Sequence, residues 1–239
     1  MQRALNTMFL LMLFSLAFAA GERTELIIGT GSVNNYLPIN TTYSYSYSQS
    51  IYLQSEINIP EQQIEKLSFY WNGAAAAPNS SQWVVYMGHT NATRFANTSS
   101  WLPLSELTQV FAGVLTINAT AGWKEIVLDA PFTYNNTQNL VIAVDENRPQ
   151  YDNYAGFFHT TASSGVNRSL RAFSDTVNID PSNPPSGGQQ TLVMAYPNVK
   201  LEFNLIPSDP IFAIAPDEYH YGEVNMGDTA NQEFVITNY

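Results

Sequence analysis

Residues 43–48 alternate tyrosine and serine without a break, and this period of two constrains the fold more than any other feature of the chain. Successive side chains of a β-strand point to opposite faces. The pattern therefore predicts a strand with Tyr43, Tyr45 and Tyr47 on one face and a polar serine face on the other. Ile51 and Leu53 continue the tyrosine face.

Further β-rich runs follow along the chain, and turn residues separate most of them. The runs are 64–71, 83–87, 110–117, 123–128, 140–144, 154–158, 169–173, 192–195 and 199–205. Turn dipeptides between them include Asn72-Gly73, Asn135-Asn136 and Ser164-Gly165. The alanines 74–77 lie between Gly73 and Pro78, which leaves room for one helical turn at most. Many short strands at this spacing predict an all-β fold, an antiparallel β-sandwich of jelly-roll-like form, over residues 20–206.

The composition excludes several classes of protein. Charged residues make up 12% of the chain, and 9 Lys+Arg against 20 Asp+Glu give a formal net charge of −11. A nucleic-acid-binding surface needs clustered Lys and Arg, so we expect no nucleic-acid partner. The sequence contains no cysteine, which excludes disulfides and thiolate metal sites.

The first 19 residues have the organisation of a secretory signal peptide. Arg3 precedes an apolar run over 8–18, and Ala17-Phe18-Ala19 matches the small-x-small cleavage pattern. A membrane-spanning helix needs about 20 apolar residues, more than this run offers. We therefore expect a secreted or cell-surface protein with no membrane span after signal removal.

Two closely spaced prolines, Pro207 and Pro210, predict a linker over residues 207–214. The stretch that follows, residues 215–239, is too short to fold as an independent domain without disulfides, a bound metal or oligomerisation. Either it docks on the main domain, or it is the start of a second domain.

Most of the region between Leu26 and Phe203 resembles a known family in several short stretches. These are 29–31 (Gly-Thr-Gly), 36–39 (Tyr-Leu-Pro-Ile), 45–52, 86–90, 122–123 (Gly-Trp), 131–135, 167–170 and 196–199 (Tyr-Pro-Asn-Val). In them the chain is similar to a β-sandwich module repeated in large secreted surface proteins of Bacteroidota and related bacteria. The resemblance implies adhesin-like and immunoglobulin-like neighbouring domains in the same longer chain, a C-terminal sorting or anchoring signal, and no catalytic motif.

The tail resembles a different family. Tyr221-Gly222-Glu223-Val224, then Gly227, then the strand-like run 234–238 look like the opening of an immunoglobulin-like module of the ASPM–SPD-2–Hydin type. Tyr221 stands where that family usually has phenylalanine. The resemblance implies that residues 215–239 begin a truncated immunoglobulin-like domain, of a kind whose bacterial members occur in exported multi-domain proteins.

Catalytic motifs are absent from the sequence. A nucleophilic mechanism would take its base from His89, His159 or His220, and neither Gly-x-Ser-x-Gly nor His-Glu-x-x-His occurs. The acidic residues include no pair that stands out as a glycosidase dyad. We therefore expect a chain that is not an enzyme and has no organic cofactor.

Calcium is the metal that the sequence favours. Ca²⁺ takes six to eight oxygen ligands from carboxylates, amides and carbonyls. Asp145, Glu146, Asp152 and Asn153 offer such oxygens after a strong apolar strand, together with Asn147. A second oxygen-rich loop contains Asp175, Asn178 and Asp180, and no EF-hand spacing is present.

Carbohydrate binding is the second chemical hypothesis, because sugar-binding β-sandwiches stack sugar rings on exposed aromatic side chains. The candidates are Trp71, Trp101, Tyr43, Tyr45 and Tyr47, of which Trp101 follows a polar loop and is expected to be the most exposed. The alternative is that the tyrosine face forms half of the sandwich interior. Trp83 and Trp123 begin strands beside apolar neighbours, so packing is expected for both.

Together these observations favour a secreted or cell-surface, non-catalytic binding or adhesion module of a larger bacterial protein, with a glycan or a surface protein as partner. Two alternatives remain. The chain is an accessory module of an exported enzyme that degrades polysaccharides or peptides, or it is a structural spacer.

Overall fold

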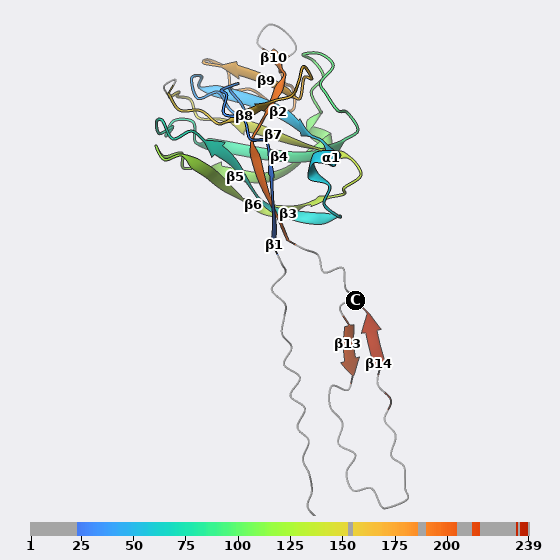
Figure 1. The fold of residues 1–239 in the computed structure, drawn as a ribbon. Coiled ribbons are helices and arrows are strands. Elements are labelled where there is room, and N and C mark those ends of the chain that lie inside the picture. The colour runs from blue at the N-terminus through green and yellow to red at the C-terminus, as the bar shows by residue number, and fades with distance from the viewer. Residues whose placement is uncertain are drawn as a thin grey trace, which may run out of the picture.

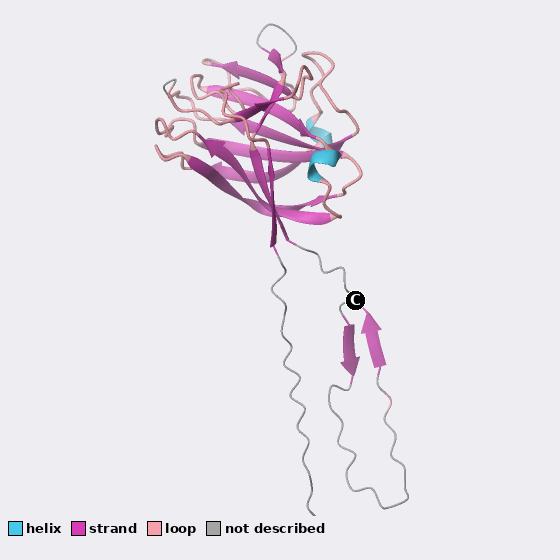
Figure 2. Ribbon diagram, viewed as in Figure 1, coloured by secondary structure: helices cyan, strands magenta, loops and turns pink. Residues whose placement is uncertain are grey.

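Two antiparallel β-sheets pack face to face and form the body of the protein (Figure 1). The computed structural model describes residues 23–152, 155–185, 190–204, 212–215, 233 and 235–238. Strands and loops make up nearly all of this part (Figure 2). The predicted all-β antiparallel β-sandwich is therefore confirmed. The predicted signal peptide, residues 1–19, lies outside the described residues.

The order of the strands defines the topology. The four-stranded sheet contains, in spatial order, β1 (Arg23–Ile28), β12 (Val199–Asn204), β3 (Gln62–Trp71) and β6 (Gly122–Tyr134). The six-stranded sheet contains β10 (Gln190–Val193), β9 (Ser169–Ser174), β2 (Tyr45–Tyr52), β7 (Asn139–Glu146), β4 (Gln82–Thr90) and β5 (Thr108–Val114). With β1-β12-β3-β6 facing β2-β7-β4-β5, the chain has the strand order of a jelly roll, and β9 and β10 extend the second sheet.

Short elements complete the described chain. They are α1 (Gln54–Ile57), the 3₁₀ turn η1 (Leu104–Glu106), the pair β8 (Thr160–Ala162) and β11 (Ala195–Pro197), and the pair β13 (Phe212–Ala215) and β14 (Val235–Asn238). β13 begins inside the residues predicted as a linker and pairs antiparallel with β14. Most of the predicted immunoglobulin-like segment lies outside the described residues. None of the helices in the described part has the length and apolar character that crossing a bilayer requires.

The main core lies between the two sheets and follows the period of two. In β3, Leu67, Phe69 and Trp71 point inward and are at most 1% exposed. The alternate residues of the same strand belong to the outer face. A register shift between Ile64 and Lys66 returns Ile64 to the inner side, which explains why the inward positions are not evenly spaced along β3.

Two predicted strands differ from the observed ones. β6 continues past the predicted end at residue 128 and passes through Pro131. Proline has no backbone N–H, but β6 is an edge strand, so the missing donor leaves no ladder bond unmade. In the described part of the predicted run 154–158, residues 155–158, only Phe158 forms an isolated bridge, with Trp71, and the next strand begins at Thr160.

The tyrosine–serine strand is β2, and both of its faces are covered. Tyr47 and Ile51 point away from the sheet interface into two smaller clusters, which residues of the 91–107 and 175–185 loops complete. The serines point to the other side, where Ser48 Oγ donates to the Pro38 carbonyl (2.5 Å) and Ser50 Oγ bonds Ser169 Oγ (2.7 Å). The tyrosine face is therefore not half of the main interior, and the serine face is not a surface.

Candidate functional site

Two of the predicted sugar-stacking residues are core residues. Trp71 and Tyr47 are both 0% exposed. The Trp71 indole N–H donates to the Ala75 carbonyl (3.0 Å), and its ring lies 4.7 Å from that of Phe158. A side chain without exposed surface presents no ring to a ligand in solution, so Trp71 and Tyr47 are excluded as stacking platforms.

The other three predicted aromatics, Trp101, Tyr43 and Tyr45, are half-buried. Trp101 stacks on Tyr47, with ring centroids 5.2 Å apart, and its indole N–H donates to the Pro185 carbonyl (3.3 Å). Tyr43 packs on Phe173 at 4.3 Å, and Tyr45 begins β2. Trp101 therefore covers the outer side of the six-stranded sheet instead of standing free in its loop.

The predicted calcium quartet is not brought together. Asp145 and Glu146 are consecutive residues of β7, so their side chains lie on opposite faces of the sheet. Asp152 accepts hydrogen bonds from the Asn79 backbone N–H and the Ser80 hydroxyl. Asn153 lies outside the described residues. In the described ranges, no three His, Cys, Asp or Glu side chains gather in a way that would hold a metal ion.

Both β7 carboxylates are nevertheless in unusual surroundings. Asp145 is 4% and Glu146 1% exposed. Burial raises the pKa of Asp145 to about 7 and that of Glu146 to about 8. Glu146 Oε1 accepts the backbone N–H groups of Arg148 (3.1 Å) and Gln82 (3.4 Å), which partly offset this shift of its pKa. Near neutral pH, each group is close to the point where it gains or loses a proton.

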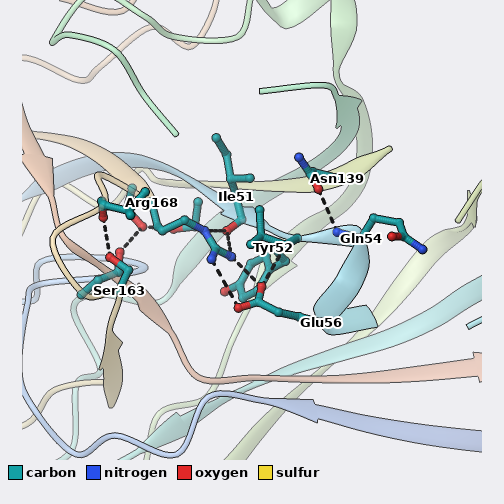
Figure 3. Close-up of polar contacts among 12 residues, drawn as sticks. Ile51, Tyr52, Gln54, Glu56, Asn139, Ser163 and Arg168 are labelled. Atoms are coloured by element: carbon teal, nitrogen blue, oxygen red, sulfur yellow. Dashed lines mark hydrogen bonds and ion pairs between the residues drawn. The ribbon is translucent and has the colours of Figure 1, made fainter. Parts of the chain in front are cut away.

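The ion pair of buried Arg168 and partly buried Glu56 is structural (Figure 3). Arg168 Nη2 lies 2.6 Å from Glu56 Oε2, and Nε and Nη2 donate to the Ile51 carbonyl at 2.8 and 2.6 Å. The guanidinium also stacks over the Tyr196 ring at 4.7 Å. These contacts fasten the residue before β9 to β2 and α1.

His89 also has a structural contact. Its Nε2 accepts the backbone N–H of Asn135 (3.2 Å), and its ring packs between Phe132 and Tyr134. Partial burial lowers its pKa. This arrangement holds the turn between β6 and β7.

A row of four partly exposed rings lies on the outer face of the four-stranded sheet. We call Phe157, His159, Tyr70 and Trp123 the outer aromatic row. The centroid distances between neighbours along the row are 5.7 Å for Phe157–His159, 4.9 Å for His159–Tyr70 and 5.3 Å for Tyr70–Trp123. The first two contacts are tilted by 32° and 36°, whereas Trp123 stands at 88° to Tyr70. The row therefore offers rings in two orientations.

Backbone hydrogen bonds hold the row in place. The Asn72 side-chain amide forms hydrogen bonds with both ends of the segment 155–157. Its Nδ2 donates to the Ala155 carbonyl (2.8 Å), and its Oδ1 accepts from the Phe157 N–H (3.2 Å). The His159 N–H donates to the Tyr70 carbonyl (2.8 Å), and the His159 carbonyl accepts the Asn198 N–H (3.0 Å). Because this segment is extended, Phe158 enters the core while its two neighbours face outward.

The surroundings of the row are polar, and their charges are paired. Lys66 bonds Glu125 (3.1 Å) and Glu202 (3.6 Å), and Lys200 bonds Glu202 (3.1 Å) and Glu25 (3.4 Å). Ser68 precedes Tyr70 on the same face and is 1% exposed, and its hydroxyl has no hydrogen-bond partner. The outer face thus combines aromatic rings with neutralised charge, and the Ser68 hydroxyl is buried beneath it.

From the sequence, Trp123 is expected to pack and is not connected with Tyr70, although a signal for their contact exists. Once Phe69 and Trp71 are assigned to the core, the period of two places Tyr70 outward, and the register pairs Tyr70 with Trp123. Phe157 and His159 had no such signal, because the contact of their segment with β3 joins residues far apart in the chain.

The fold and this face define an all-β jelly-roll sandwich with a solvent-facing aromatic row. Comparison of the chain with family models, with curated proteins and with solved structures gave no match.

Proposed function

We propose that this chain is a non-catalytic binding module of an exported bacterial surface protein and that it binds a neutral glycan on the outer aromatic row. The observation that carries the proposal is the row itself: four neighbouring, partly exposed rings on the outer face of a β-sandwich.

The chemistry of the row suits a sugar. The axial C–H groups of a pyranose are weakly positive, and they pack against the negative face of an aromatic ring. Ligand sites combine such apolar surface with a few polar groups that orient the ligand. The His159 imidazole can serve that purpose, since it is partly exposed and its ring lies 4.9 Å from that of Tyr70.

The charge around the row favours a neutral glycan over an acidic one. Both neighbouring lysines, Lys66 and Lys200, are already paired with glutamates. The whole chain carries a formal net charge of −11, which would repel a uronic-acid or sulfated polymer.

The test is a binding assay with the purified chain against a panel of neutral and acidic polysaccharides, with affinity electrophoresis as a screen and calorimetry for Kd. Truncation of an aromatic anchor in a binding site costs about 2 kcal/mol, which corresponds to a roughly 30-fold weaker Kd. We expect Trp123→Ala and Tyr70→Ala to show this loss. Tyr151→Ala, at an exposed ring in a loop, is the matched control and should bind normally.

Two results would refute the assignment. A flat profile across the glycan panel removes the glycan as ligand. Binding that survives both Trp123→Ala and Tyr70→Ala places the site elsewhere. Thermal unfolding of each variant, measured in parallel, separates loss of the site from loss of the fold.

The exported location is part of the proposal and has its own support in the predicted signal peptide. The apolar run over 8–18 and the Ala17-Phe18-Ala19 pattern predict cleavage after residue 19. Mass spectrometry of the protein expressed with its own N-terminus should find a mature chain that begins at Ala20. An uncleaved chain retained in the cytoplasm would contradict export.

A further inference from the structure

The rings of the outer aromatic row do not lie in one plane. The planes of neighbouring rings differ by 32° between Phe157 and His159, by 36° between His159 and Tyr70, and by 88° between Tyr70 and Trp123. Two rings at 88° to each other cannot both lie flat against one surface. The row therefore constrains the shape of a ligand as well as its chemistry.

The backbone fixes the perpendicular pair. Tyr70 of β3 and Trp123 of β6 are direct partners in the register of these two strands. Phe69 and Trp71, the neighbours of Tyr70 in the chain, are at most 1% exposed in the core, which holds Tyr70 at its place on the sheet. The Tyr70 ring contacts the rings of both Trp123 and His159, so its rotation is limited. The two ring orientations are thus present before a ligand arrives, and binding need not pay to order them.

The end of the row at Trp123 has open space beside it. A Cβ placed on the preceding residue, Gly122, would meet nothing within 4 Å beyond its chain neighbours. The loop residues 118–121 before it are exposed. A ligand that reaches Trp123 therefore has room to continue past the row, as a polymer chain must.

Neutral polysaccharides differ in how their successive sugar rings are turned. In chains of the cellulose type the rings lie in one plane, and the chains stack into flat crystalline sheets. In chains of the laminarin and amylose types the linkage turns each ring relative to the previous one, so the chain curves. A curved chain can place one sugar against Tyr70 and the next against Trp123, because the two ring centroids, 5.3 Å apart, are separated by about one sugar unit.

We propose, on the basis of the proposed glycan-binding function, that the row selects soluble, curved single chains of a neutral glucan over flat chains and crystalline surfaces. A curved chain uses both perpendicular rings, whereas a flat chain or sheet lies against only one of them. Loss of one aromatic anchor corresponds to a roughly 30-fold weaker Kd, which is the selectivity that we expect.

The experiment compares the Kd of the full chain, measured by calorimetry, for laminari-, malto- and cello-oligosaccharides of equal length. A pull-down with microcrystalline cellulose is added. We expect at least one of the two curved series to bind roughly 30-fold tighter than the cello-series, and the chain to remain in solution in the pull-down.

Two variants at Trp123 connect the selectivity with the perpendicular ring. Trp123→Ala should weaken binding of the curved series to the level of the cello-series, because one of the two ring orientations is gone. Trp123→Phe keeps a ring at this position and should keep the order of preference, which separates loss of the ring from loss of the fold. Tyr151→Ala, at an exposed ring in a loop, is the control and should keep both affinity and preference.

The failure of this inference and the failure of the proposed function are distinguishable. If no soluble glycan binds, or if both Trp123→Ala and Tyr70→Ala leave binding unchanged, the proposed function is overturned and the inference with it. If Trp123→Ala weakens binding but the wild-type chain binds the cello-series or crystalline cellulose as tightly as the curved series, the site stands and this inference alone is overturned.

Discussion

The two buried carboxylates of β7 predict that the protein loses stability as the pH rises through neutrality. Asp145 and Glu146 have folded-state pKa values of about 7 and about 8, whereas in an unfolded chain they have ordinary values near 4. At pH values between the unfolded-state and folded-state pKa values of these carboxyls, the native state holds protons that the unfolded state releases. Raising the pH therefore favours unfolding, which is the opposite of the usual behaviour of a salt-bridged carboxylate.

The size of the effect follows from the same pKa values. From about pH 6.5 to about pH 8.5, the linkage relation gives a loss of about 1 kcal/mol from Asp145 and about 2 kcal/mol from Glu146. A total of about 3 kcal/mol lowers the Tm of a domain of this size by about 6 to 12 °C. His89 and His159, whose pKa values burial lowers, act in the opposite sense, but only below about pH 6.5, where the unfolded chain binds their protons.

The assay is urea denaturation with EDTA present, repeated at steps of half a pH unit from about pH 6.5 to about pH 8.5. The neutral isosteres Asp145→Asn and Glu146→Gln cannot ionise, so the first should reduce the slope of stability against pH and the second should reduce it more. The double variant should be nearly flat. A wild-type chain whose unfolding free energy is constant or rises between pH 6.5 and 8.5 would show that neither carboxyl is protonated in the folded state.

Three further predictions concern packing and buried charge. Trp71→Ala should cost about 3 to 5 kcal/mol in urea denaturation, because it empties a fully buried site, and a cost below about 1 kcal/mol would contradict its place in the core. Arg168→Met should cost about 1 to 3 kcal/mol, because it removes the donors to the Ile51 carbonyl and the cation that pairs with Glu56, whereas Lys66→Met on the solvent-facing side should cost less than about 1 kcal/mol. Gly156→Ala should cost about 1 to 3 kcal/mol and alter tryptophan fluorescence, because the added Cβ would lie 2.3 Å from Trp71 Cζ2; an unchanged spectrum would argue against that contact.

The fold class was accessible from the sequence because strand alternation is a local property. The run 43–48 becomes β2, the run 83–87 becomes β4, and Gly73 adopts the positive φ of 77° that its turn dipeptide suggested. The extent of β6 was not accessible, because Pro131 is tolerated only on an edge strand, and the edge is a property of the whole sheet.

The candidate sites were less accessible for a related reason. Period two separates the faces of a strand without saying which face is covered. Trp71 and Tyr47 are aromatic residues of the kind that form sugar-binding surfaces, but both are buried. Tyr70 and Trp123 become neighbours only through the register of β3 with β6.

The sequence by itself determined that the chain forms strands, that disulfides and thiolate metal sites are excluded, and that acidic residues outnumber basic ones. Those properties depend on spacing and composition alone. Only the tertiary structure decided that the tyrosine–serine strand is covered on both faces, that Asp145 and Glu146 are both buried, and that Asn147 meets Asn178. Each of these depends on which distant segments pack together, because burial and proximity are set by the contacts of the folded chain and not by the order of its residues.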